Sequence, residues 1–219
     1  MAIYLAVNVP HVELRAVTPE EIRTFERCIA AGRVALFPAD TVYGLATEPD
    51  SREGIERLYR LKRRRPDRPA AVMFFDKELA LEALPDLPPV TSTAAERLLP
   101  GGVTLLLPNE AHRFPLACEP NKDVLGLRVP KLTETLAPLQ QMRRPVLQSS
   151  ANRSGGQEAR RLADVDEHVR SGVDLILDGG ELPGTPSTVV DLTGYHESGR
   201  FEIVRAGAVS EEAVRVALG

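Results

Sequence analysis

The apolar runs of this sequence are all short, and this feature constrains the fold more than any other. Runs at 34–37, 103–107 and 124–129 have the length of strands, and a proline follows each of them. Segments with the apolar spacing of helices lie between the runs. No run reaches the ~18–20 residues that a membrane span needs. We therefore expect a soluble α/β fold in which helices and strands are intermixed.

The order of the predicted elements favours one domain with a mixed sheet. Thr18 is a typical helix N-cap, with Pro19 at the first helical position and Glu21 at the third. The chain has no internal repeat or Gly/Ser linker, and it lacks the G-x-G-x-x-G and Walker A motifs, which disfavours a standard dinucleotide or P-loop site. Helices are predicted over 18–31, 51–62, 76–84, 91–99, 133–141, 164–170 and 210–218, and strands over 34–37, 70–75, 103–107, 124–129, 146–148, 175–177, 187–192 and 201–204, with an edge strand within 1–13.

Basic residues are distributed unevenly along the chain. The formal net charge is −4, which argues against nucleic-acid binding as a property of the whole molecule. Many positive charges nevertheless gather near the end of one predicted helix. Polyphosphate would satisfy such a cluster, and a solvated loop or a nucleic-acid contact are the alternatives. The cluster comprises Arg57, Arg60, Lys62, Arg63, Arg64, Arg65 and Arg68.

Cysteine usage and the N-terminal sequence indicate the compartment. Cys28 and Cys118 are too few and too isolated for a disulfide framework or a zinc site. The first ten residues lack the basic segment with which a signal peptide begins. We therefore expect a cytoplasmic protein that does not associate with a membrane.

Polar loops beside the predicted strands are the places where chemistry is expected. Hydroxyls and glycines in such loops bind small polar ligands or cradle phosphate, although each loop can also be a plain turn. Arg128, at the end of an apolar strand, is costly unless it is paired, either with a ligand carboxylate or bicarbonate or with an internal Asp or Glu. No metal-ligand set, Ser-His-Asp triad or Cys nucleophile is evident, so the composition suits nucleotidyl or phosphoryl transfer. The loops are 40–44, 62–69, 127–130, 148–156, and 185–191 with 204–207.

Taken in order, these loops resemble the YrdC/TsaC family of L-threonylcarbamoyladenylate synthases. The resemblance runs from about 18 to 209. It rests on 32–45 (GRVALFPADTVYGL), K-x-R at 62–64, P-G-x-x-T at 100–104, R-[VI]-P at 128–130, S-x-N at 150–152 and S-T-V-[VI]-D at 187–191. Each motif is weak alone, and their order along one chain is specific. The segment from 178 to 193 also resembles YciO-like paralogues.

The resemblance implies a single α/β domain with a twisted mixed sheet, helices and a basic concave cavity. This domain would span 18–209, with an N-terminal extension or edge strand at 1–17 and a C-terminal helix at 210–219 packed on it. The length of 219 residues is expected for the short, single-domain form of the family.

The implied activity makes L-threonylcarbamoyl-AMP and pyrophosphate from L-threonine, bicarbonate and ATP, with Mg²⁺ accompanying ATP. The product would serve tRNA threonylcarbamoyladenosine formation and pass to tRNA threonylcarbamoyl transferase proteins. Lys62, Arg64, Ser150 and Asn152 would be catalytic. ATP would be held by these four residues with Arg68 and Arg205, and threonine and bicarbonate by Thr41, Tyr43, Arg128 and Ser187.

Two other functions remain open from the sequence. The same surface would suit a protein that binds tRNA or double-stranded RNA without synthase activity, which would show steeply salt-dependent binding. A paralogue that uses a different acceptor in place of threonine is the other alternative.

Overall fold

The computed structural model describes residues 3–4, 17–65, 67–68, 70–153 and 155–219. In this part of the chain ten strands form one sheet in the order β1-β8-β2-β3-β7-β4-β6-β5-β9-β10. The strands are β1 (Ile3–Tyr4), β2 (Ala35–Pro38), β3 (Tyr43–Thr47), β4 (Ala71–Met73), β5 (Val103–Pro108), β6 (Val124–Arg128), β7 (Val146–Ser150), β8 (Leu175–Leu177), β9 (Thr188–Asp191) and β10 (Glu202–Arg205). The helices are α1 (Pro19–Ala30), α2 (Arg52–Lys62), α3 (Lys77–Glu82), α4 (Pro89–Leu98), α5 (Glu167–Ser171), α6 (Tyr195–Ser198) and α7 (Glu211–Leu218), with 3₁₀ turns η1 (Ala137–Gln141) and η2 (Leu162–Asp164).

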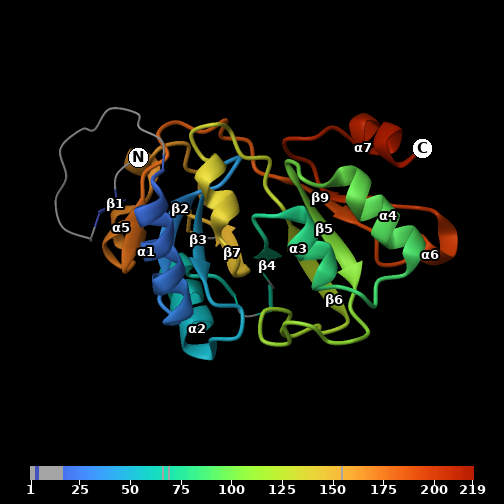
Figure 1. Ribbon diagram of the computed structural model, residues 1–219, viewed down its shortest axis with the longest axis horizontal. Helices are drawn as coiled ribbons and strands as arrows, with labels where there is room; N and C mark the ends of the chain where they lie inside the picture. Colours follow the sequence, from blue (N-terminus) through green and yellow to red (C-terminus); the bar gives the residue numbers. More distant parts are fainter. Residues whose placement is uncertain (1–2, 5–16, 66, 69, 154) are drawn as a thin grey trace.

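The sheet is mixed, which confirms the predicted α/β class. The pairs β2–β8, β4–β6 and β5–β9 are parallel, and the other neighbours are antiparallel. Figure 1 shows β4 at the middle of the molecule, with β3 and β7 on its left and β5 and β6 on its right. Helices α1 and α2 accompany the left group, and α3 and α4 accompany the right group. Residues from both groups can therefore meet over β4.

Local signals set the start of α1, as predicted. Thr18 Oγ1 accepts a hydrogen bond from Glu21 N at 3.3 Å, and Glu21 Oε2 accepts one from Thr18 N at 2.7 Å, which completes a capping box. The buried face of the helix brings Phe25 against Phe37 of β2, with ring centroids 5.4 Å apart. Phe75 packs edge-on against both rings. This aromatic cluster fixes α1 on the sheet.

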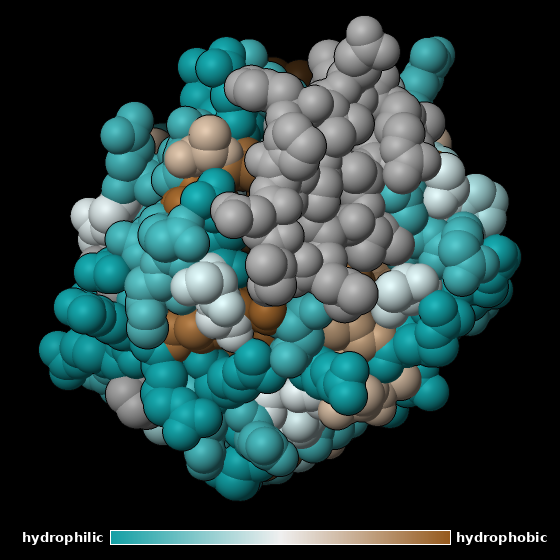
Figure 2. Space-filling model, turned by 90° about the vertical axis from the view of Figure 1, so that its left-hand side faces the viewer, coloured by the Kyte–Doolittle hydropathy of each residue, from teal (hydrophilic) through white to brown (hydrophobic). Residues whose placement is uncertain are grey.

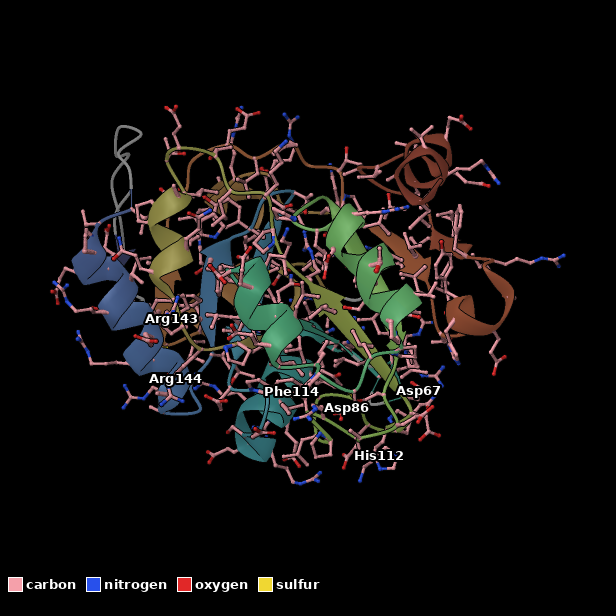
Figure 3. The ribbon with its side chains drawn as sticks, turned by 45° about the vertical axis from the view of Figure 1, so that its right-hand side comes forward. Asp67, Asp86, His112, Phe114, Arg143 and Arg144 are labelled. Atoms are coloured by element: carbon pink, nitrogen blue, oxygen red, sulfur yellow. The ribbon has the colours of Figure 1, made fainter. Side chains whose placement is uncertain are left out.

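The loop 109–123, which joins β5 to β6, also reaches α2. Asn109 Nδ2 donates to Arg113 O at 3.0 Å and to Lys122 O at 2.8 Å, so one side chain organises residues 109–123. Figure 3 shows Asp86, His112 and Phe114 together below α3 and α4. Asp86 accepts from Arg113 Nη2 at 2.6 Å, while Glu119 binds Arg52 of α2 at 3.1 Å. The exposed Arg52–Glu119 ion pair is the contact among these that joins the loop to α2.

Two predictions of local structure were wrong, and one helix was missed. The 133–141 helix is reduced to the 3₁₀ turn η1, because Pro138 lacks an N–H and disfavours helical backbone in the residue before it. The segment after Asp40 is not only a loop, since 43–47 form the fully buried strand β3. Helix α6 was not predicted; it has four residues and ends at Ser198, and the residue that follows, Gly199, has a φ of 64°. Of the expected strand within 1–13, only Ile3–Tyr4 belongs to the described residues, at the sheet edge.

The C-terminal helix α7 lies against α4. Val214 and Leu218 of α7 are buried, and Arg97 Nη1 of α4 donates to Leu218 O at 2.9 Å.

Figure 2 shows that the side of the molecule at the left of Figure 1 is mostly hydrophilic where its residues are described. None of the helices in the described residues is both long enough and apolar enough to cross a membrane.

Candidate active site

One cavity of about 790 Å³, including its open mouth, lies over strands from both groups. Its floor is the sheet face that carries Ala71, Gly126 and Leu106, which alternate along their strands with core residues on the opposite face. Three arginines and several hydroxyls line it. The described lining is Val42, Arg64, Ala70, Ala71, Thr104, Leu106, Val124, Gly126, Arg128, Gln148, Ser149, Ser150, Pro186, Ser187, Val189 and Arg205.

Small residues keep the floor of this cavity open. A Cβ built on Gly126 would lie 3.4 Å from Ala71 Cα and 3.5 Å from Ala71 Cβ, which is ordinary contact. Any atoms beyond that Cβ would extend into the cavity, because residues 124, 126 and 128 share one face of β6. The glycine therefore preserves volume for a ligand rather than satisfying a backbone constraint.

Lys62, at the end of α2, is the centre of the first group of site residues, which we call the Lys62 cluster (Lys62, Arg64, Ser150 and Asn152). Its side chain is almost fully buried, and Nζ donates to Ser150 O, to Asn152 O at 2.7 Å and to Asn152 Oδ1 at 3.2 Å. All three ammonium protons therefore have acceptors. Burial lowers the pKa of Lys62 to about 7, and the charge of Arg64 acts in the same direction while Glu158 opposes it.

The loop after β7 receives this ammonium group in a fixed shape. Ser150 Oγ donates to Asn152 Oδ1 at 2.6 Å, and Asn152 Nδ2 donates to Gly156 O at 2.6 Å. Ser154, within the predicted 148–156 loop, lies outside the described residues. Lys62 and Asn152 therefore stand behind Ser150 and hold the loop, whereas Ser149 and Ser150 face the cavity.

Arg64 brings the basic loop to the cavity. Its Nε donates to Arg68 O at 2.8 Å, its guanidinium lies 5.8 Å from the Tyr59 ring centroid, and Nη1 lies 3.4 Å from Ser149 Oγ. Arg64 thereby lines the cavity, where an anion would meet its positive charge. The Arg68 side chain is exposed and lies outside the described lining, and Pro66 and Pro69 are outside the described residues.

Arg128 forms the second group with Asp40 and Thr41, which we call the Arg128 cluster. Arg128 Nη2 donates to Asp40 Oδ1 at 2.5 Å and to Thr41 Oγ1 at 3.2 Å, and the side chains of Arg128 and Asp40 are 3% and 5% exposed. Asp40 is thus the internal carboxylate that the sequence left open. Burial raises the pKa of Asp40 and lowers that of Arg128, and each group's charge opposes the shift of the other.

The Arg128 guanidinium retains donors for a ligand. Its Nη2 donates to Asp40 and Thr41, no hydrogen bond from Nη1 occurs among the described residues, and Arg128 lines the cavity. A guanidinium has five N–H donors in a planar fork, which matches a carboxylate. The arrangement therefore serves both predictions for Arg128, an internal ion pair and a place for a ligand carboxylate.

Ser187 and Arg205 lie beside the Arg128 cluster. Arg205 Nη2 donates to Ser187 O at 2.6 Å and to Ser187 Oγ at 3.2 Å, and Thr104 Oγ1 lies 2.8 Å from the same hydroxyl. The charge of Arg205 contributes to the lowered pKa of Arg128. The structure therefore brings Arg205 to the residues expected to bind threonine and bicarbonate, in addition to the cavity it shares with Arg64.

Tyr43 has a different place from the one expected for it. Its ring is fully buried, and its hydroxyl donates toward Asp178 Oδ1 and Gly180 O, each at 2.9 Å, and accepts from Gly179 N at 2.8 Å. Burial and the Asp178 charge raise the pKa of this hydroxyl. Tyr43 is not part of the cavity lining, so its geometry is that of a tie between β3 and the 178–180 loop.

Two polar residues at the site were not singled out from the sequence. Gln148 lines the cavity at 5% exposure, and Glu158 has a buried carboxylate oxygen with no partner among the described residues. The signal available for Gln148 was its place at the end of the predicted 146–148 strand, where the polar 148–156 loop begins. Nothing in the local sequence distinguishes Glu158.

The structure defines an α/β domain with an arginine-lined cavity over the middle of a mixed sheet. Comparison with known proteins shows the family to which it belongs. Residues 27–207 match the Sua5_yciO_yrdC family model, described as telomere recombination. The chain belongs to this family.

Curated relatives cover most of the chain. It is 28% identical over 200 residues to the threonylcarbamoyl-AMP synthase of Pyrococcus abyssi, covering 91% of this chain and 57% of that protein. It is 31% identical over 169 residues to the threonylcarbamoyl-AMP synthase of Pseudomonas fluorescens, covering 76% and 89%. The Bacillus subtilis relative is matched over 53% of its length, so the chain spans just over half of two of these proteins.

Solved structures agree with the fold. P. abyssi Sua5 complexed with L-threonine superposes with a TM-score of 0.78 at 26% identity, over 95% of this chain and 61% of that one. Escherichia coli YciO superposes with a TM-score of 0.76 at 21% identity over 92% and 96%, which shows the fold alone.

Proposed function

We propose that this protein is a nucleotidyltransferase that makes L-threonylcarbamoyl-AMP from L-threonine, bicarbonate and ATP. The observation that carries the proposal is that one cavity joins the Lys62 cluster to the buried, incompletely hydrogen-bonded guanidinium of Arg128. Relatives named threonylcarbamoyl-AMP synthase, and a related structure complexed with L-threonine, support the choice of substrates. The product would serve tRNA threonylcarbamoyladenosine formation through tRNA threonylcarbamoyl transferase proteins.

The reaction requires two bond-forming steps. The threonine amine bonds to the carbon of bicarbonate with loss of water, which gives a carbamate. A carbamate oxygen then bonds to the α-phosphorus of ATP while the bond from that phosphorus to the bridging oxygen of the β-phosphate breaks. Pyrophosphate leaves with the electron pair. Neither step needs a protein nucleophile, so positioning and charge stabilisation are the tasks of the site.

The residues divide these tasks. Arg128, with Thr41, Ser187 and Arg205 around it, would hold the threonine carboxylate and the bicarbonate side. Arg64 and the hydroxyls of Ser149 and Ser150 would contact the ATP phosphates. Lys62 and Asn152 would act mainly through the shape of the loop, since the protons of Lys62 already have acceptors.

Mg²⁺ would accompany ATP. The described residues contain no group of three His, Cys, Asp or Glu side chains that would hold a metal ion. We expect this Mg²⁺ to arrive with the nucleotide and to take most of its ligands from phosphate and water.

The test is pyrophosphate release by the purified protein. We expect release only with threonine, bicarbonate and ATP together, a lower rate with serine in place of threonine, and loss of at least about 100-fold in Arg64→Ala and Arg128→Met. Arg215→Gln, a change at an exposed ion pair on α7, should match the wild type. Release that is independent of bicarbonate, or unchanged in both site variants, would rule out the proposed reaction.

RNA binding is a second candidate function, favoured by one observation. The side chains of Arg60 and Arg63 are exposed, and no partner for either occurs among the described residues. Cytoplasmic tRNA or double-stranded RNA would neutralise them. Binding should then weaken steeply with salt and should lose about one unit of salt slope for each arginine replaced.

A further inference from the structure

Gln148 on β7 is a buried polar residue with an unused side chain. It is 5% exposed, it lines the cavity, and its carboxamide has no hydrogen-bond partner among the described residues. Buried amides are nearly always paired, because an unsatisfied one is costly. A partner for Gln148 must therefore come from the cavity, which is where a ligand enters.

The surroundings of Gln148 leave room for its amide. A Cβ built on Gly44 would lie 2.8 Å from Gln148 Nε2 and 3.1 Å from Phe37 Cε1. The absence of a side chain at Gly44 is what gives the amide its room. The glycine of the 40–44 loop motif thus has a specific consequence for the cavity.

Gln148 also lies on the floor that joins the two clusters. It pairs with Ala71 of β4, and Ala71 in turn contacts Gly126 of β6. Ser150 follows Gln148 by two residues on the same face of β7, and Arg128 follows Gly126 by two on the same face of β6. The row formed by Gln148, Ala71 and Gly126 is therefore the part of the floor between Ser150 and Arg128.

We propose that the Gln148 carboxamide binds the carbamate group of the N-carboxylated amino acid. This inference rests on the proposed function, in which the amino acid is anchored by Arg128 and the nucleotide phosphates by Arg64 and Ser150. The group that joins the two substrates is the carbamate, and it must lie between those anchors. Gln148 is the polar side chain of the floor row that the structure leaves without a partner there.

The chemistry of a carboxamide matches that of a carbamate. A carbamate presents an N–H donor beside an oxygen acceptor, and a carboxamide presents an oxygen acceptor beside an NH₂ donor. Two hydrogen bonds would fix its orientation toward the α-phosphorus. A cation in the same place would hold the carbamate oxygens more strongly and reduce their nucleophilicity, so a neutral side chain suits an attacking group better.

The experiment compares Gln148→Glu and Gln148→Met with Gln141→Glu. Gln141 is exposed at the end of η1 and provides the same chemical change away from the cavity. In adenylate synthesis we expect kcat to fall about 10- to 100-fold and the KM for bicarbonate to rise in both Gln148 variants, while ATP affinity stays within about threefold. Gln141→Glu should match the wild type.

The pH dependence separates binding of the carbamate from a merely structural role. A buried glutamate at 148 would have a raised pKa, and its protonated form has a donor that the ionised form lacks. The loss of kcat in Gln148→Glu, relative to the wild type at the same pH, should therefore become smaller as the pH falls. The loss of kcat in Gln148→Met should stay constant.

The outcomes distinguish this inference from the proposed function. If the wild type makes adenylate and both Gln148 variants keep the kcat and bicarbonate KM of Gln141→Glu within about twofold, the role of Gln148 is refuted and the synthase function stands. Equal loss of ATP binding and of turnover would also refute it. If the wild type makes no adenylate from the three substrates, both proposals fall together.

Discussion

The buried pair of Asp40 and Arg128 allows a direct test of how the site is held together. In Asp40→Asn the side chain keeps its size and can still accept from Lys131 N, but the guanidinium of Arg128 loses its countercharge. Both side chains are at most 5% exposed, so water cannot replace the carboxylate without a rearrangement. Removing one partner of such a pair typically costs about 3–5 kcal/mol.

This cost is large compared with a typical stability of about 5–15 kcal/mol for a folded domain. It corresponds to a change of roughly 10² to 10⁴ in the equilibrium between folded and unfolded protein. The measurement is urea unfolding at pH 7, with the wild-type and variant slopes compared, because an unchanged slope shows that the same surface is exposed on unfolding.

A matched control is available on α7. Arg215 and Glu211 have the same N–O distance of 2.5 Å as the buried pair, but their side chains are 60% and 59% exposed. Glu211→Gln should therefore change the stability by no more than about 0.5 kcal/mol. The double variant Asp40→Asn with Arg128→Met should be more stable than Asp40→Asn alone, because it leaves no buried charge. If Asp40→Asn lowers the free energy of unfolding no more than Glu211→Gln does, burial does not determine the strength of the Asp40–Arg128 pair and the reasoning fails.

Three further predictions follow from the site. The pKa of Lys62 is about 7 in the folded protein against an ordinary 10.5, so between these values the unfolded chain binds the extra proton and the Lys62 contribution to stability rises with pH. Phosphates bound nearby raise that pKa, so ATP binding near pH 7.5 should take up a proton, seen by calorimetry in buffers of different ionisation enthalpy and absent in Lys62→Met. Gly126→Ala should fold with a stability within about 1 kcal/mol of the wild type. Gly126→Leu should fold but lose ligand binding, because its side chain fills the cavity. If the two variants lose binding equally, this explanation is wrong. Tyr43→Phe should lower the free energy of unfolding by about 1–3 kcal/mol, because Gly179 N loses its acceptor, and should leave the KM values unchanged. A raised KM for threonine without any loss of stability would show instead that Tyr43 binds the substrate.

Local sequence predicted those parts of the fold that local interactions determine. The N-caps at Thr18, Ser51, Asp76 and Ser210 each accept a hydrogen bond from the backbone three residues later, and all four helix starts were predicted. The strand runs that end at prolines also form strands. In contrast, η1 depends on one proline inside a favourable pattern, and the strand at 43–47 depends on pairing with β2 and β7.

The side-chain partners at the site could not be predicted from residue spacing, because they lie far apart in the sequence. Arg128 was predicted to need a carboxylate, yet its partner Asp40 lies 88 positions away in the sequence. Tyr43 belongs to a motif of the site but turns its hydroxyl toward 178–180, 135 to 137 positions away. Gln148 belongs to a predicted polar loop, but its lack of a hydrogen-bond partner among the described residues is evident only in the folded chain.

The position of β7 has a consequence for how the molecule opens. This strand pairs on one side with β3 and on the other with β4, and it carries Gln148, Ser149 and Ser150. Amides hydrogen-bonded on both sides of an interior strand exchange only when a large cooperative unit unfolds, whereas exposed loops open at little cost. The polar groups on β7 are therefore built into a slowly exchanging part of the protein. The motions that admit and release ligands must therefore belong to parts of the molecule outside β7.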